Sequence, residues 1–170
     1  SRPADEVSAL MKLFEQYLGD AEKYVKDNTR LIFLGDKSKF SEKLRLRMEE
    51  LEEKSRDFDS MTVLLAMNYG GRDEIVRAAR RAAALVKDRS ITLDQIDESL
   101  FSSLLYTGGI PDPDLIIRPG GEKRLSNFLT WESAYSELYF TDVLWPDFNA
   151  KELDKALEDF AQRGRRFGGI

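Results

Sequence analysis

One stretch of the sequence gathers the residue types that bind phosphate. Arg118 and Arg124 bring positive charge to it, and Ser126 adds a hydroxyl. Between the two arginines, Gly120 and Gly121 let a ligand approach the backbone closely. Two arginines in fork geometry suit a diphosphate better than a single charge does. The spacing therefore predicts a loop that binds a diphosphate group.

The elements around this loop must hold it in place. Residues 115–117 form a short apolar run that predicts a buried strand, and this run ends directly in the loop. Loops at the ends of such strands are where α/β sheets bind their ligands. Ser126 is expected to cap a following helix, whose N-terminus would add N–H groups and a positive dipole end. Helical spacing predicts that this helix turns four side chains to the core: Phe128, Trp131, Tyr135 and Leu138.

The rest of the chain alternates predicted strands and helices. Apolar runs predict strands at residues 30–34 and 61–67 and a last short strand formed by 138–140 and 143–145. Helical periodicity predicts helices at residues 3–21, 40–58, 73–87, 92–105 and 153–160. The run at 61–67 is nearly continuous, which is typical of a parallel strand covered on both faces. Strands separated by helices predict an α/β fold with a mainly parallel sheet flanked by helices.

Two local signals refine these elements. Thr92, with Gln95 three residues later, has the pattern of a capping box. The pair Gly70–Gly71 follows the strand at 61–67, where it forms either a second ligand loop or only a tight turn. The tight turn is the better supported of the two interpretations.

Length and composition bound the class of protein. A chain of 170 residues suits a single domain over residues 1–170. The net charge of −5 argues against nucleic-acid binding. Because the chain has neither cysteine nor histidine, it lacks disulfides, thiolate zinc ligands and a histidine base. No apolar run approaches the roughly 18 residues of a transmembrane helix, and no signal peptide is visible. We therefore expect a cytoplasmic protein that at most associates with a membrane surface.

The segment that holds the phosphate loop also carries a family resemblance. RPGGEKRLSNFLTWESAYSELYFTDVLWPDF closely resembles the C-terminal signature of the cis-prenyltransferases, in particular the bacterial undecaprenyl diphosphate synthases. DEVSALMKLF, LGDKSKF, AMNYGGRDEIV and RRFGG extend the match over essentially the whole chain.

The resemblance implies a transferase of prenyl groups that elongates a chain. An allylic diphosphate such as farnesyl diphosphate would react with isopentenyl diphosphate, a proton would be lost, and a cis double bond would form. Repetition would give undecaprenyl diphosphate, the lipid-carrier precursor for peptidoglycan synthesis, which is delivered to the membrane. Mg²⁺ would neutralise the departing diphosphate. The family also implies a homodimer.

The resemblance assigns substrate contacts residue by residue. Arg118, Arg124 and Ser126 would hold isopentenyl diphosphate, with the backbone at Leu125 between them. Arg2 matches the arginine of an arginine-proline pair that contacts substrate diphosphate.

Further positions match the metal site and the subunit boundary. Glu137, in AYSEL, would bind magnesium together with an aspartate from the family's N-terminal motif. One straight helix would place it ~16 Å from Ser126, so the helix must break, the site must be elongated, or other segments must share the metal. Arg166 and Gly168 match a terminal arginine-x-glycine element that reaches into the neighbouring subunit's active site. Glu122 is expected to orient the arginines.

The sequence also departs from the family pattern. Members begin with an aspartate-glycine-asparagine-glycine-arginine-tryptophan motif and a later serine-x-glutamate-asparagine-tryptophan motif, which supply the metal-binding aspartate and a residue for proton removal. This sequence starts at Ser1 and contains neither, so no catalytic residue is assigned in it. We expect the C-terminal portion of a synthase-like domain, weak or inactive alone. Pro119 stands where threonine or serine is usual and removes an N–H and a hydroxyl beside the phosphate.

Two other interpretations stay open. The chain could be a non-catalytic, dimerising subunit or an inactive fragment that binds isopentenyl diphosphate, in which case a full-length partner would raise activity. It could also be a generic α/β phosphate-binding protein, which would bind ordinary nucleotides and show no preference for isoprenoid diphosphates.

Overall fold

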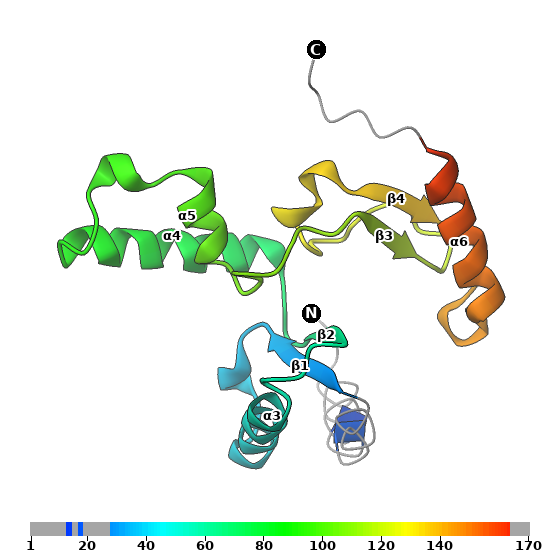
Figure 1. The fold of residues 1–170 in the computed structure, drawn as a ribbon, viewed down its shortest axis with the longest axis horizontal. Coiled ribbons are helices and arrows are strands. Elements are labelled where there is room, and N and C mark those ends of the chain that lie inside the picture. The colour runs from blue at the N-terminus through cyan, green and yellow to red at the C-terminus, as the bar shows by residue number, and fades with distance from the viewer. Residues whose placement is uncertain (1–12, 15–16, 19–27, 164–170) are drawn as a thin grey trace. The chain divides into compact units, whose positions relative to one another are not determined.

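A computed structural model of the chain describes residues 13–14, 17–18 and 28–163 (Figure 1). The chain divides into two compact units, Ser1–Tyr69 and Gly70–Ile170, and each is described by itself. The single domain over residues 1–170 stays a prediction. Arg2, Arg166 and Gly168, which the family resemblance brings to the site, lie outside the described residues.

The first unit is built on a pair of parallel strands. β1 (Thr29–Leu34) pairs with β2 (Met61–Ala66), and Thr29 lies opposite Met61 at the start of the register. Helix α3 (Glu42–Lys54) joins them and begins where the Ser41 side chain accepts a hydrogen bond from the Leu44 N–H. The helix turns three side chains into the core of the unit, at helical spacing: Leu44, Met48 and Leu51. The core is completed by Leu18, Leu31, Phe33, Phe40 and Met67.

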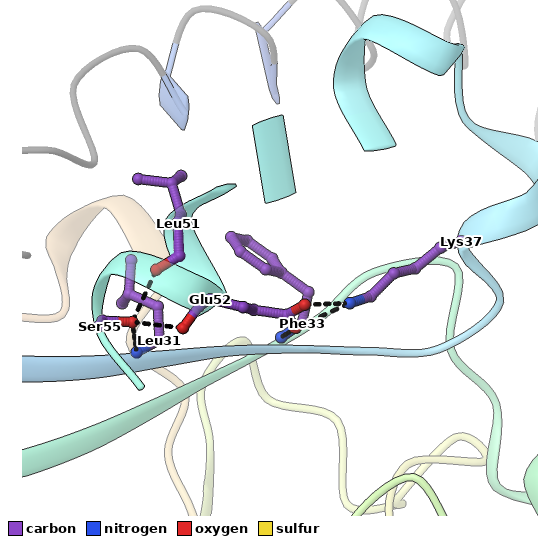
Figure 2. A network of polar contacts seen from close by, with 6 residues as sticks. All are labelled: Leu31, Phe33, Lys37, Leu51, Glu52 and Ser55. Atoms are coloured by element: carbon purple, nitrogen blue, oxygen red, sulfur yellow. Dashed lines mark hydrogen bonds and ion pairs between the residues drawn. The ribbon is translucent and has the colours of Figure 1, made fainter. Parts of the chain in front are cut away.

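Side chains of α3 also satisfy the backbone of β1 (Figure 2). The N–H of Leu31 donates to Ser55 Oγ at 3.0 Å, and the N–H of Phe33 donates to Glu52 Oε1 at 2.8 Å. Glu52 is held in turn by Lys37 Nζ at 2.7 Å. Because buried backbone donors must find a partner, these contacts satisfy two N–H groups of β1. They fix α3 along β1.

The prediction that the strand at 61–67 is covered on both faces is wrong. Val63 packs against the core of the unit, but Met61 is 56% exposed and Leu65 is 38% exposed. The apolar run sets the strand, whereas burial needs covering elements. Among the described residues of the first unit, α3 packs along β1, and the side chains of β2 stay exposed or half-buried.

The second unit contains a helical layer and a second strand pair. Its helices are α4 (Gly71–Lys87), α5 (Glu98–Ser103) and α6 (Ala150–Gln162), and its strands are β3 (Leu115–Arg118) and β4 (Glu137–Phe140). β3 and β4 are parallel. The two helices α4 and α5 pack through a small buried cluster made of Ala78, Ala82, Leu104 and Leu105. Trp131 packs against that cluster and stacks at a tilt on Phe101, with ring centroids 4.8 Å apart.

Element boundaries differ from the prediction where caps intervene. The capping box at Thr92 and Gln95 is present, but it opens only a short 3-10 helix over Leu93–Gln95. Asp97 then caps α5 separately by accepting the Leu100 N–H at 2.7 Å. The predicted helix at 92–105 is therefore two pieces. The strand expected at 143–145 does not form, and a 3-10 helix with Pro146 in its first turn spans Trp145–Asp147 instead.

The fold class is confirmed as α/β. In the described part of the chain the four strands form two parallel pairs with helices beside them. No helix in that part is both long enough and apolar enough to cross a bilayer.

Candidate functional site

Residues 119–131, which we call the clamp loop, follow β3 without forming the expected helix. Ser126, Asn127 and Leu129 have positive φ angles of 51°, 67° and 46°. Because left-handed backbone cannot continue a right-handed helix, the prediction that Ser126 caps a helix is wrong. The prediction that the aromatic side chains of this helix face the core is also wrong in part. Trp131 is packed, but Phe128 and Tyr135 are 41% and 76% exposed.

The structure nevertheless brings together the three side chains predicted to hold a diphosphate. Arg118 Nη1 donates to Ser126 Oγ at 2.9 Å, and Arg124 Nε donates to the same oxygen at 3.2 Å. Arg118 also donates to the Arg124 carbonyl, and Arg124 pairs with Glu122. Two guanidinium groups thus converge on one hydroxyl. The half-buried Leu125 lies between Arg124 and Ser126 in sequence, and its carbonyl accepts the Phe128 N–H at 3.1 Å.

The glycines shape the loop and do not present their N–H groups to a ligand. Gly120 and Gly121 have φ angles of 93° and 77°, which favour glycine. The N–H of Gly120 donates to the Val143 carbonyl at 2.8 Å, and that of Gly121 donates to the Thr141 carbonyl at 2.9 Å. These bonds tie the start of the clamp loop to the segment after β4. The loop is therefore anchored at this end by backbone contacts, with Pro119 in place.

The other end of the clamp loop lies on the N-terminus of α4. The N–H of Gly71 donates to the Asn127 carbonyl at 2.8 Å, and the N–H of Arg72 donates to Asn127 Oδ1 at 2.8 Å. A Cβ on Gly71 would lie 2.3 Å from Thr130 Oγ1. The tight-turn interpretation of Gly70–Gly71 did not foresee this contact. A helix that starts with glycine and without a capping side chain was the available signal.

Glu137 is the first residue of β4 and lies opposite Leu115. Because no continuous helix connects it to Ser126, the ~16 Å separation along such a helix does not apply. Its Oε2 pairs with Arg163 Nη1 at 2.8 Å, and Arg163 also donates to the Leu138 carbonyl at 3.1 Å. The hydrogen bond to Glu137, followed by that to Asp159, raises the pKa of Arg163.

The carboxylate of Glu137 is of the donor type that Mg²⁺ prefers. Magnesium is commonly bound by one or two carboxylates together with substrate phosphates and water. Within residues 13–14, 17–18 and 28–163, no group of three or more acidic, histidine or cysteine side chains gathers around a common point. Glu137 therefore fits the part of a single carboxylate ligand, and Arg163 is its partner in this structure.

A second acidic side chain is buried close to the loop in sequence. Glu132 is 2% exposed, and its Oε1 accepts a hydrogen bond from Thr107 Oγ1 at 2.6 Å. Partial burial, followed by the charge of Glu132, raises the pKa of Asp112 above its ordinary value of 3.8. The negative charge of Glu132 thus disfavours ionisation of Asp112.

Comparisons with known proteins give one consistent result. A family model described as putative undecaprenyl diphosphate synthase matches residues 1–168. An isoprenyl transferase of Fusobacterium nucleatum is 50% identical over 171 residues, which cover 100% of this chain and 71% of that protein. The ditrans,polycis-undecaprenyl-diphosphate synthase ((2E,6E)-farnesyl-diphosphate specific) of Haemophilus influenzae is 45% identical, with 99% and 71% covered.

A solved structure agrees with the sequence comparisons. Lavandulyl diphosphate synthase from Lavandula x intermedia, in complex with dimethylallyl diphosphate, matches with a TM-score of 0.95 at 39% identity. The match covers 99% of this chain and 74% of that one. Sequence and fold therefore point to the same group of proteins.

Proposed function

Because the chain belongs to the undecaprenyl diphosphate synthase family of prenyltransferase enzymes, we propose that its clamp loop binds isopentenyl diphosphate for cis-prenyl chain elongation. Arg118 and Arg124 would hold the diphosphate, and the Ser126 hydroxyl would donate a hydrogen bond to it. The backbone at Leu125 keeps the two side chains Arg124 and Ser126 on either side of the anion. Held in this way, the substrate presents its double bond to C1 of the allylic partner.

The convergence of two guanidinium groups on Ser126 Oγ carries this proposal. Arg118 gives its hydrogen bonds to a hydroxyl and a carbonyl, and across the described residues no carboxylate is found in an ion pair with it. A positive charge that neutral groups orient but do not neutralise is suited to an anion. Arg124 pairs with Glu122, which orients its guanidinium beside that of Arg118. Charge-assisted hydrogen bonds from both arginines would then reach one diphosphate.

The names of the relatives support a finer proposal for the reaction. The name of the Haemophilus influenzae relative specifies (2E,6E)-farnesyl diphosphate, and we propose this allylic substrate for the present chain too. The product would be a long-chain undecaprenyl diphosphate, the lipid-carrier precursor for cell-wall synthesis, made in the cytoplasm and delivered to the membrane. Bound Mg²⁺, held in part by Glu137, would neutralise the departing diphosphate. Arg2 would contact substrate diphosphate, and Arg166 and Gly168 would complete the site across a homodimer.

Isothermal titration with isopentenyl diphosphate and magnesium tests the clamp. The wild-type chain is expected to bind, and Arg124→Ala is expected to weaken binding by about 2 kcal/mol, as for a lost charge-assisted contact. Arg80→Ala is the matched control, because it removes the same charge from an exposed position of α4. Titration with ADP provides the comparison with a generic phosphate-binding protein.

Two results would overturn the proposal. One is a folded wild-type chain that binds no isopentenyl diphosphate, or binds ADP equally well. The other is an Arg124→Ala variant that binds as tightly as the Arg80→Ala control.

A further inference from the structure

We propose that Asn127 is a positioning residue, which seats the clamp loop on the N-terminus of α4 and thereby sets the distance between Ser126 and Arg118. The inference rests on the proposed function, because it assigns the residue that gives the diphosphate clamp its geometry. Asn127 would not touch the substrate. Its amide oxygen is used in the contact with α4.

Helix α4 begins without a capping side chain at its own N-cap position. The first N–H groups of any helix lack partners within the helix and need a cap. In α4 the N-cap position is Gly70, which has no side chain to supply one. Asn127 replaces it from elsewhere in the chain: its carbonyl accepts the Gly71 N–H and its Oδ1 accepts the Arg72 N–H, both at 2.8 Å. One loop residue therefore caps a helix that starts 56 positions earlier in the sequence, since 127 − 71 = 56.

The clamp loop also closely approaches Gly70 and Gly71. A Cβ on Gly70 would lie 2.7 Å from Asn127 Nδ2. A Cβ on Gly71 would lie 2.3 Å from Thr130 Oγ1 and 2.8 Å from the Thr130 backbone nitrogen. A side chain at Gly71 would clash with the Thr130 backbone, and one at Gly70 would force the Asn127 amide to shift. The Gly70–Gly71 pair thus forms a seat whose shape admits the clamp loop.

Asn127 connects this seat to the side chains proposed to bind the diphosphate. Arg118 ends β3 and is fixed by the strand, whereas Ser126 lies in the loop. Asn127 directly follows Ser126, and both residues are in the left-handed conformation, so no flexible tether separates the anchor from the hydroxyl. If Asn127 loses its hold on α4, Ser126 moves relative to Arg118. Binding sites lose affinity when their groups move by about 1 Å, because charge-assisted contacts depend on geometry.

The test compares two asparagines that cap helices in the same way. Asn149 Oδ1 accepts the Lys151 N–H at 3.0 Å at the start of α6, and Asn149 Nδ2 donates to the Asp147 carbonyl, so both side-chain contacts lie outside the clamp loop. Asn127→Ala and Asn149→Ala each lose one side-chain cap, a loss of similar kind for stability. Isothermal titration with isopentenyl diphosphate is expected to show about tenfold weaker binding for Asn127→Ala. Asn149→Ala should stay within about twofold of the wild-type chain, and magnesium is held constant throughout.

Two further variants separate positioning from a general loss of structure. Asn127→Asp keeps an acceptor of the same shape, tolerates the left-handed backbone and places a carboxylate where a helix N-terminus favours it. It should bind within about threefold of the wild-type chain. Gly71→Ala disturbs the same seat from the helix side and leaves the sequence of the loop unchanged. It should weaken binding as Asn127→Ala does.

The outcomes distinguish this inference from the proposed function. If Arg124→Ala weakens binding as expected while Asn127→Ala binds like the wild-type chain, the proposed function stands and the positioning role is overturned. Equal losses for Asn127→Ala and Asn149→Ala would also overturn it. If the folded wild-type chain binds no isopentenyl diphosphate, the proposed function fails. In that case hydrogen exchange tests the contact between Asn127 and α4. Asn127→Ala should speed exchange at the Gly71 and Arg72 amides, and unchanged rates would overturn the inference.

Discussion

Nη1 of Arg163 lies 2.8 Å from Oε2 of Glu137, and this contact joins the end of α6 to the first residue of β4. Arg163 also pairs with Asp159 one turn earlier in the helix. The side chains of Arg163 and Glu137 are 31% and 33% exposed, so water screens the pair only in part. The carboxylate that we propose as a magnesium ligand thus has a structural partner of its own.

Arg163→Ala is expected to lower the free energy of unfolding by about 1 kcal/mol, because it leaves a half-buried carboxylate without its partner. Urea denaturation measures the change. Lys155→Ala is the control: its pair with Glu152 is more exposed on the lysine side, at 61%, and its loss should cost less stability. Equal losses would show that the Arg163 contact contributes no more than a surface ion pair.

Glu137→Gln is expected to reduce the effect of magnesium on substrate binding. The substitution keeps the size of the side chain and removes the charge that a hard cation requires. Titration with isopentenyl diphosphate, with and without Mg²⁺, should show a magnesium-dependent gain that is about tenfold smaller than in the wild-type chain. Glu158→Gln makes the same change at an exposed position of α6 and should leave the gain intact. An undiminished gain in Glu137→Gln would exclude it as a ligand.

Asp112→Asn is expected to stabilise the chain at neutral pH but not in acid. The pKa of Asp112 is raised above 3.8 in the folded state, so the folded chain holds this proton more tightly than the unfolded chain. Ionised Asp112 therefore costs stability above its folded pKa, and the cost disappears below 3.8, where both states are protonated. Thermal unfolding of the wild-type chain and of Asp112→Asn, from acid to neutral pH, measures the difference in stability. A gain that is independent of pH would contradict the electrostatic cause.

Ser55→Ala is expected to destabilise the first unit by about 2 kcal/mol. Ser55 is fully buried, and the substitution leaves the Leu31 N–H without its acceptor. Equilibrium unfolding in urea measures the loss. Ser90→Ala removes a hydroxyl from an exposed position and should change stability by less than about 0.5 kcal/mol. If Ser55→Ala behaves like this control, water satisfies the strand donor equally well.

The sequence predicted which side chains come together better than it predicted the secondary structure around them. Arg118, Arg124 and Ser126 are identified by residue type and spacing, and the structure brings them together. The helix expected after Ser126 was wrong because hydropathy does not register backbone handedness. Three residues of the loop, none of them glycine, adopt the left-handed conformation there: Ser126, Asn127 and Leu129. The apolar spacing that indicated a helix is shared by a loop in which Trp131 packs against the cluster between the helices.

Contacts between distant segments account for the rest of what was missed. The bond from Arg72 to Asn127 and the pair of Arg163 with Glu137 join residues 55 and 26 positions apart. No local pattern encodes either partner, so periodicity and capping rules cannot find them. The capping box at Thr92 shows the converse, because a local signal was found correctly but did not determine how far its helix extends.

The hydrogen bonds that β1 donates to Glu52 and Ser55 at the end of α3 affect the direction in which this pair of strands can grow. With the Leu31 and Phe33 donors already taken by Ser55 and Glu52, an incoming strand meets a side of β1 that cannot act as a template. Among the described residues β2 has no second strand beside it. Any additional strand, from this chain or another, would therefore be recruited next to β2, where Met61 and Leu65 offer apolar surface for it to cover.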